Sequence, residues 1–152
     1  MIIENIELLK EIFTSILQQT AFMFAEEIGR ENIDIPDKYL LSTINFTGYA
    51  SGEISIIIPE KAAAQMFANM LGIENGADAE KQKKDCVGEI LNVLCGQYLT
   101  SAAGEAPVFN LSIPKTSKIT ASQIEKFISG KRKSASLFVE NLKVYITLEI
   151  GK

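Results

Sequence analysis

Three polar side chains share one face of an otherwise apolar stretch, residues 85–99. Asp85, Glu89 and Asn92 follow one another at spacings of four and three residues, which places them on one face of a helix. Most other positions of the stretch are apolar, so the helix is expected to be largely buried. A carboxylate and an amide on a buried helix cost free energy unless they are paired or face water. The strip therefore predicts a polar seam on which another surface docks.

Two glycines, Gly88 and Gly96, lie beside this polar strip. A glycine inside a helix costs about 1 kcal/mol relative to alanine, but it removes a side chain and lets another backbone approach closely. The pair supports the docking interpretation. The alternative is a solvent-facing stripe that only keeps the helix soluble, because charged residues usually just face water. The residues alone leave both interpretations open.

The composition excludes several kinds of chemistry. The chain of 152 residues contains no histidine, which removes Ser-His-Asp and Cys-His catalysis and histidine metal sites. Any catalysis must use carboxylates, amides, hydroxyls or lysine, or groups of a partner. Cys86 and Cys95 are nine residues apart and point in opposite directions from one helix, so they can neither bridge nor share a metal. We expect two free, buried thiols and no metal site in this chain.

The charge pattern and the chain's N-terminus narrow the expected partners and location. The net charge is −4, which gives no support for a nucleic-acid partner or an anionic membrane surface. The one basic run, residues 131–133, is expected to be a solvated loop. The first residues are acidic and amphipathic, unlike a signal peptide, and no apolar run approaches the roughly 20 residues of a membrane span. The sequence predicts a soluble, cytoplasmic protein that does not associate with membranes.

Hydrophobic periodicity and turn residues predict the order of the elements. Helices are expected where apolar residues recur every three or four positions, and strands where they alternate. A polar loop over 74–78 separates the second and third helices, and residues 115–133 are weakly patterned. The elements expected are a helix over 4–28, a hairpin over 39–47 and 52–58, helices over 60–71 and 79–103, a strand over 108–113, a short helix over 121–128 and a hairpin over 134–140 and 143–150.

These elements predict one α+β domain over residues 1–152, with an N-terminal helix over about 4–28 and a core over about 35–150. Hairpins imply antiparallel pairing, so the sheet should be mainly antiparallel. Alternation in the last hairpin predicts one buried and one solvated sheet face. The architecture expected is two-layered, with long helices packed on one face of the sheet.

The chain resembles the CheC/CheX/FliY phosphatases of bacterial chemotaxis. Their signature is Asp or Ser, three residues, Glu, two residues, Asn, and a proline about two dozen residues later; here these positions are Asp85, Glu89, Asn92 and Pro114, the proline about one position early. The segments INFTGYASGEISIII, PEKAAAQMFANMLG and NLSIPKT are similar to the family as well, and the likeness covers residues 35–150. Only one Glu-x-x-Asn site is present, whereas the CheC and FliY branches typically show two. The resemblance is therefore greatest to the single-site CheX branch.

The resemblance implies dephosphorylation of the aspartyl phosphate on a CheY-like receiver domain. Phosphoryl transfer to water depends on positioning and charge stabilisation, and the receiver would supply Mg²⁺ and a lysine, so that this chain itself binds no cofactor. Asn92 would hold the attacking water, and Glu89 would pair with the receiver's lysine. Asp85 would have either a structural role or a contact with the partner, and Gly88 and Gly96 would let the two surfaces close.

Two further points follow from the resemblance. Proteins of the CheX branch dimerise by exchanging strands, and the final hairpin together with residues 115–133 could serve this purpose, because unpaired sheet edges invite pairing. The alternative function is a non-catalytic module of the same fold that docks on a receiver or in a signalling assembly. A third possibility is that the polar strip only faces water.

Overall fold

The computed structural model describes residues 4–29, 35–72 and 79–151. Within these ranges, seven strands form one antiparallel sheet in the order β1-β6-β7-β3-β2-β4, and β5 also pairs with β2. The helices are α1 (Ile6–Thr20), α2 (Glu60–Leu71), α3 (Glu80–Ala103) and α4 (Ala121–Ile128); the strands are β1 (Ala25–Glu26), β2 (Lys38–Gly48), β3 (Gly52–Pro59), β4 (Phe109–Leu111), β5 (Lys115–Thr120), β6 (Lys133–Val139) and β7 (Leu142–Ile150).

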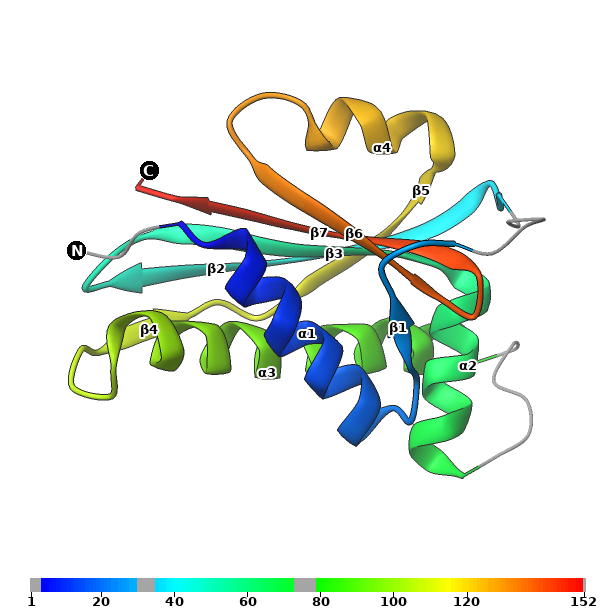
Figure 1. Cartoon of the computed structure of the whole chain (residues 1–152), viewed down its shortest axis with the longest axis horizontal. Helices are drawn as coiled ribbons and strands as arrows, with labels where there is room; N and C mark the ends of the chain where they lie inside the picture. The colour runs from blue at the N-terminus through cyan, green and yellow to red at the C-terminus, as the bar shows by residue number, and fades with distance from the viewer. Residues whose placement is uncertain (1–3, 30–34, 73–78, 152) are drawn as a thin grey trace.

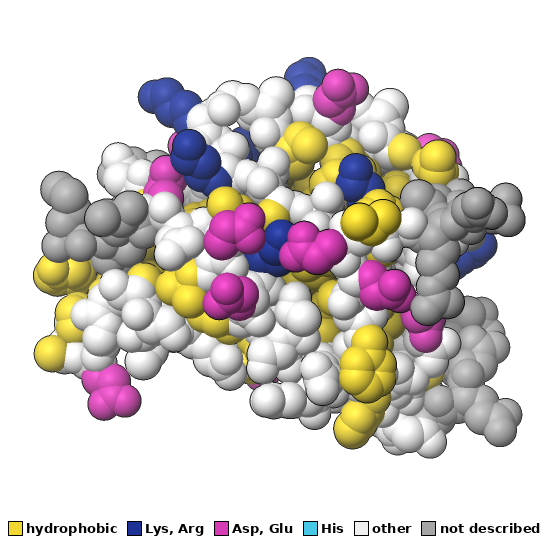
Figure 2. Space-filling view, in the orientation of Figure 1, with side chains coloured by type: hydrophobic (Ala, Val, Ile, Leu, Met, Phe, Trp, Pro, Cys, Tyr) yellow, Lys and Arg dark blue, Asp and Glu magenta, His cyan; other side chains and the backbone are white. Residues whose placement is uncertain are grey.

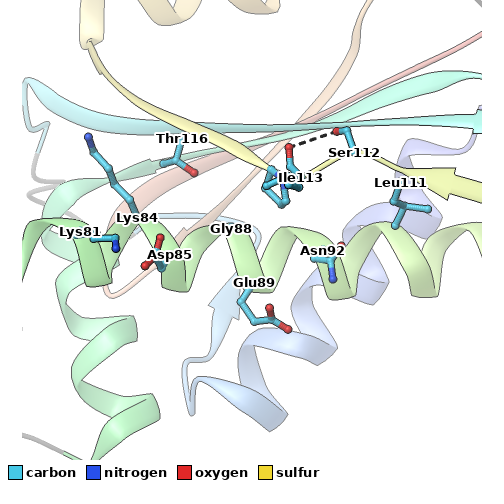
Figure 3. A pocket seen from close by; sticks show the side chains of 11 residues that line it. Lys81, Lys84, Asp85, Gly88, Glu89, Asn92, Leu111, Ser112, Ile113 and Thr116 are labelled. Atoms are coloured by element: carbon cyan, nitrogen blue, oxygen red, sulfur yellow. Dashed lines mark hydrogen bonds between the residues drawn. The ribbon is translucent and has the colours of Figure 1, made fainter.

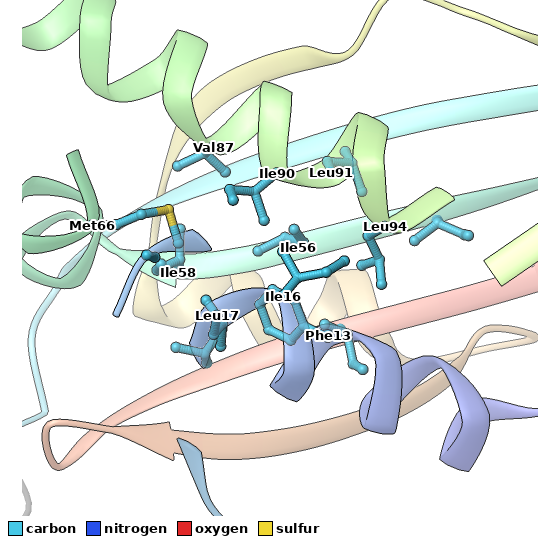
Figure 4. Packing of buried hydrophobic residues seen from close by; sticks show 14 of the residues in the cluster. Phe13, Ile16, Leu17, Ile56, Ile58, Met66, Val87, Ile90, Leu91 and Leu94 are labelled. Carbon is cyan, nitrogen blue, oxygen red and sulfur yellow. The ribbon is translucent and has the colours of Figure 1, made fainter. Parts of the chain in front are cut away.

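The three longer helices cover one face of the sheet, as Figure 1 shows. The main core lies between these helices and the sheet, where α1, α2 and α3 meet the inward side chains of β2, β3 and β7. Figure 4 shows the packing: Phe13, Ile16 and Leu17 of α1 and Val87, Ile90 and Leu91 of α3 converge on Ile56 of β3. The α+β class and the antiparallel sheet under long helices are confirmed.

The expectation of one solvated sheet face is wrong in part, because α4 packs on the other face (Figure 1). Ile124 of α4 forms a second, smaller cluster with Tyr39 of β2 and Ile57 of β3. Since β3 is central and covered from both sides, all eight of its residues are buried. Alternation identifies which side chains face the main core, but it does not reveal a short helix that covers the opposite face.

The first helix is shorter than predicted. It ends at Thr20, and the chain then turns back and adds β1 to the edge of the sheet beside β6. Phe22 has a left-handed backbone (φ 54°), which a continuous helix cannot accommodate. Phe24 and Ile28, which the periodicity assigned to the helix's apolar face, are 68% and 81% exposed. The apolar periodicity over 4–28 therefore overstates the length of this helix.

An ion pair holds the returning segment against α1. The ammonium of Lys10 lies 2.9 Å from Glu27 Oε1 and 3.3 Å from Glu7 Oε2. Figure 2 shows basic and acidic side chains interspersed on the face of the molecule seen in Figure 1. These contacts favour the turn over continuation of the helix.

The other elements follow their local signals closely. The first hairpin, α2, α3 and α4 begin and end within a residue or two of the predicted bounds, and Gly72 caps α2 in the left-handed conformation. The predicted loop over 74–78 lies outside the described residues. Strand β5 was not predicted, since its sequence is polar and it is recognised only through its pairing with β2. None of the helices in the described part of the chain is long and apolar enough to cross a membrane.

Candidate functional site

The polar strip of α3 is exposed, while the rest of the helix is packed on its neighbours. Asp85, Glu89 and Asn92 are each exposed, whereas Ile90 and Leu91 beside them are 1% and 0% exposed. Figure 3 shows the three polar side chains projecting from the helix surface. Across the described residues, neither Glu89 nor Asn92 has a hydrogen bond or ion pair within the chain. Both groups are thus available to an incoming molecule.

These side chains line an open groove of about 580 Å³. One wall is α3, and the other is the segment that joins β4 to β5 and begins β5 (Figure 3). Asp85, Gly88, Glu89 and Asn92, all singled out by the sequence, are brought together here. The groove is completed by residues that the sequence analysis did not single out as site residues: Lys81, Lys84, Leu111, Ser112, Ile113 and Thr116, together with Pro114.

The wall opposite α3 is fixed in place by hydrogen bonds to β2. The backbone N–H of Ser112 donates to the carbonyl of Asn45 at 2.8 Å, and the N–H of Asn45 donates to Ser112 Oγ at 3.0 Å. The Ser112 hydroxyl in turn donates to the carbonyl of Ile113 at 3.4 Å, the bond drawn in Figure 3. Since β2 is paired along its length with β3, this wall is part of the sheet rather than a free loop.

Gly88 and Gly96 occupy different environments. Gly88 is buried, and a Cβ there would lie 3.4 Å from Pro114 Cβ, so the glycine allows α3 to approach the chain's own Pro114. A Cβ at Gly96 would meet nothing within 4 Å. Gly96 lies instead in an adjoining groove of about 270 Å³ that shares Leu111 with the first. The contacts of Gly88 and Gly96 with a partner, which the sequence analysis suggested, stay predictions.

The start of α3 is held to the sheet by charges. Glu80 accepts from Lys83 at 3.1 Å and from Lys118 of β5 at 3.0 Å. These ammonium groups lower the pKa of the Glu80 carboxyl, Lys118 contributing most. The helix that carries the strip is thereby fixed at its N-terminal end as well as along its buried face.

The thiol nearest to the strip is not a nucleophile. Burial, together with a smaller effect of the negative charge of Glu89, raises the pKa of Cys86 to about 11. Burial alone raises the pKa of Cys95 to about 12. Both cysteines are free and buried, as predicted. Thiolate chemistry is therefore excluded at neutral pH, and the groove offers an amide, carboxylates, hydroxyls and lysines.

The sequence analysis missed the apolar and basic lining of the groove. Ile113 is 85% exposed and Leu111 is 37% exposed, although an apolar residue in a β-rich run is usually read as buried. Lys81 and Lys84, near the start of α3, were not singled out either. The one signal in the sequence was Pro114, which lies between β4 and β5 and packs against Gly88 of α3.

Comparisons with known proteins identify the family of this chain. A family model described as chemotaxis phosphatase CheX matches residues 40–140, more than half of the chain. A search of curated proteins gave no match.

Solved structures of similar fold include several CheX proteins. The chemotaxis protein CheX from Vibrio vulnificus is 19% identical, with a TM-score of 0.70 over 96% of this chain and 95% of that one. CheX from Desulfovibrio desulfuricans is 18% identical, with a TM-score of 0.68 over 95% and 97%. The CheX–CheY–BeF3–Mg²⁺ complex from Borrelia burgdorferi is 18% identical, with a TM-score of 0.68 over 99% of each chain. With the family model covering residues 40–140 and these structures sharing the fold, the chain belongs to the CheX family.

Proposed function

We propose that this protein is a phosphatase that removes the aspartyl phosphate of a CheY-like receiver domain. The observation that carries the proposal is the pair Glu89 and Asn92, which stands exposed on a firmly packed helix, beside an open groove, with no hydrogen bond to any other described residue. The Borrelia burgdorferi relative, solved as a complex with CheY, BeF3 and Mg²⁺, supports a receiver as the partner.

Asn92 is the catalytic residue in this proposal. Its amide oxygen can accept a hydrogen bond from water and its NH2 group can donate one to a phosphoryl oxygen, so that it can hold a water molecule in line with the bond that breaks. Because phosphoryl transfer needs little covalent chemistry from the protein, one well-placed amide is enough if the rest of the site is supplied by the partner. The buried neighbours Ile90 and Leu91 keep α3 rigid, which lowers the cost of positioning.

In this proposal, Glu89 sets the position of the receiver relative to this protein. It lies three residues before Asn92, so the two groups are about 4.5 Å apart along the helix axis. Its carboxylate would pair with a lysine beside the receiver's phosphorylated aspartate, in a charge-assisted hydrogen bond. Magnesium held by the receiver would neutralise charge on the phosphoryl group. Asp85, one turn before Glu89, would add a further polar contact at the rim.

The second candidate is a binding module that docks on a phosphorylated receiver without turnover. The same exposed strip supports it, since a groove fitted to a partner serves capture as well as catalysis. The two functions differ in one quantity, the rate at which the bound receiver loses its phosphate.

The decisive experiment measures the decay of a phosphorylated receiver with the wild type and with Asn92→Ala. We expect the substitution to lower the maximal rate about 100-fold or more, as loss of a positioned donor commonly does, while affinity for a receiver loaded with beryllium fluoride persists. Gln97→Ala is the matched control, because Gln97 is an exposed amide on the same helix that does not line the groove. Binding of the wild type without faster decay would favour the binding module instead.

A second variant, Glu89→Lys, tests the docking contact. The new ammonium would face the partner's lysine, so we expect affinity for the loaded receiver to fall by about tenfold or more. Glu125→Lys makes the same change of charge on α4, on the opposite face of the sheet, and should leave affinity unchanged. Equal affinities of the two variants would contradict the role given to Glu89.

A further inference from the structure

The groove has an apolar lip that the reaction itself does not require. Leu111 and Ile113 line the wall that faces the polar strip, and they are 37% and 85% exposed. Figure 3 shows both near α3, in the same groove as Asn92. Exposed large side chains beside a polar site are a common mark of a docking surface.

The backbone that carries Ile113 is fixed from three sides. Ser112 is bonded in both directions to Asn45 of β2, at 2.8 and 3.0 Å. Pro114 restricts the preceding residue to an extended conformation, and its own ring packs over Gly88 of α3. The side chain of Ile113 is therefore presented to solvent by a backbone segment that is held in place on both sides.

The charges of the groove indicate the kind of surface that covers it. Lys81 and Lys84 line the groove at the N-terminal side of the strip, in a chain whose net charge is −4. Asp85 and Glu89 line it beside them, so the groove presents both signs of charge and suits a partner that carries an anionic phosphoryl group next to a cation, while the lip on the other wall favours apolar side chains. A partner that fits both carries a phosphoryl-bearing acidic site with apolar side chains next to it.

We propose that Leu111 and Ile113 form a docking lip that packs on apolar side chains flanking the phosphorylated site of the receiver. The lip supplies affinity, and Asn92 supplies the chemistry. The identity of the partner rests on the proposed function. The place of contact is inferred from the groove itself, because the lip and the pair Glu89 and Asn92 line the same groove.

The test compares Ile113→Ser with Ile35→Ser. Both isoleucines are highly exposed, 85% and 80%, so neither variant should unfold the chain. Ile35 precedes the start of β2, whereas the lip lies beside the other end of that strand. Eleven residues of strand separate these ends, which is roughly 35 Å at about 3.3 Å per residue. Ile35→Ser is thus a remote control with the same chemistry.

The probe is a CheY-like receiver from the same organism, loaded with beryllium fluoride and Mg²⁺ for binding and phosphorylated for decay. We expect Ile113→Ser to raise Kd about tenfold, as loss of one buried isoleucine contact does, and to leave the rate at saturation within about twofold. Ile113→Leu should retain affinity, and Ile35→Ser should match the wild type.

The outcomes separate the lip from the proposed activity. Equal Kd for Ile113→Ser and wild type would overturn the lip, as would a lower rate at saturation with unchanged Kd. Weaker binding by Ile113→Ser to a receiver whose decay the wild type never accelerates would support the lip and contradict the phosphatase. Absence of wild-type binding to the loaded receiver would overturn the lip.

Discussion

Asn92 illustrates what a single amide needs in order to act on a partner. It is exposed, while Ile90 and Leu91 on the other faces of the same helix turn are buried. The packing of these neighbours therefore fixes the helix and, with it, the position of Asn92. Glu89 is placed in the same way, and neither group has a hydrogen bond or ion pair within the described part of the chain. At the scale of residues, the site is two polar side chains whose partners lie outside the molecule.

Thr147 is a buried polar residue whose hydroxyl lacks a partner among the described residues. It is 1% exposed on β7, opposite Ser55 of β3, whose own hydroxyl is bonded to Thr43 at 3.1 Å. A buried hydroxyl without a hydrogen bond costs free energy, so Thr147→Val should raise the free energy of unfolding by about 1 kcal/mol. Urea denaturation measures this, with Ser55→Ala, which breaks a bond, expected to lower it. A less stable Thr147→Val would show that the hydroxyl is satisfied.

The two thiols predict a loss of stability at alkaline pH. In the unfolded chain they titrate near 9.0, whereas burial raises the pKa of Cys86 to about 11 and of Cys95 to about 12 in the folded chain. Below pH 9 both states hold these protons and the stabilisation is complete. Above pH 9 the unfolded chain releases protons that the folded chain retains, so the free energy of unfolding falls as the pH rises towards 12. Urea denaturation at pH 8 and 10 should show a steeper fall in the wild type than in Cys95→Ala; parallel curves would contradict this.

Helix α3 is the element that decides the function. Its 24 residues run the length of the sheet, packed on α1, α2 and the strands, and anchored at the start by Glu80. Such a helix keeps its exposed strip in a fixed position relative to the β4–β5 segment. The groove therefore exists before any partner arrives, which lowers the ordering cost of binding.

Gly96 allows a test of whether this helix carries a glycine that lowers stability but favours binding of a partner. Since a Cβ at Gly96 meets nothing within 4 Å, Gly96→Ala should gain helix propensity and raise the free energy of unfolding by about 0.5–1 kcal/mol. If the partner approaches Gly96, the same variant should bind the loaded receiver more weakly. Thermal melting and titration measure the two effects separately. A variant less stable than the wild type would contradict the open space at this position.

At the scale of the whole molecule, one arginine fastens α4 to the sheet. The basic run over 131–133 was expected to be solvated, but Arg132 Nε donates to Glu53 Oε1 at 3.1 Å, and Nη1 donates to the carbonyl of Phe127 at 3.3 Å. Its guanidinium also lies 4.1 Å from the centre of the Phe127 ring. These contacts hold the end of α4 against the central strand β3.

Removing this arginine should loosen the second layer. Arg132→Met leaves the carboxylate of Glu53, which is 9% exposed, without this cation. We expect the free energy of unfolding to fall by about 2 kcal/mol or more, because breaking one partner of a buried pair is costly. The double variant with Glu53→Gln should recover part of the loss, which a double-mutant cycle measures. Additive effects of the two substitutions would show that the pair is not coupled.

The sheet also changes how a dimer could form. In the final hairpin, β7 lies between β6 and β3, and β6 is paired with β1 only at Phe138–Val139. Among the described residues, the open edges are thus the outer side of β1, the rest of β6 and the outer side of β4 and β5. We propose a homodimer through one of these edges, which sedimentation at several concentrations would test.

The sequence by itself determined the elements with strong local signals. The hairpin over 39–58, helices α2 and α3 and the short α4 were predicted because prolines, glycines and periodicity mark their ends. It also predicted the strip of Asp85, Glu89 and Asn92, since residues three and four positions apart lie on the same face of a helix.

Tertiary structure decided the rest, because those features depend on residues far apart in the chain. The end of α1 follows from the ion pair between its Lys10 and Glu27 of the returning segment and from the pairing of β1 with β6, and polar β5 is a strand only beside β2. The apolar lip exists because Ser112 is bonded to Asn45, 67 residues earlier. Local sequence fixes which side chains share a helix face, whereas the wall that faces them is set by long-range pairing.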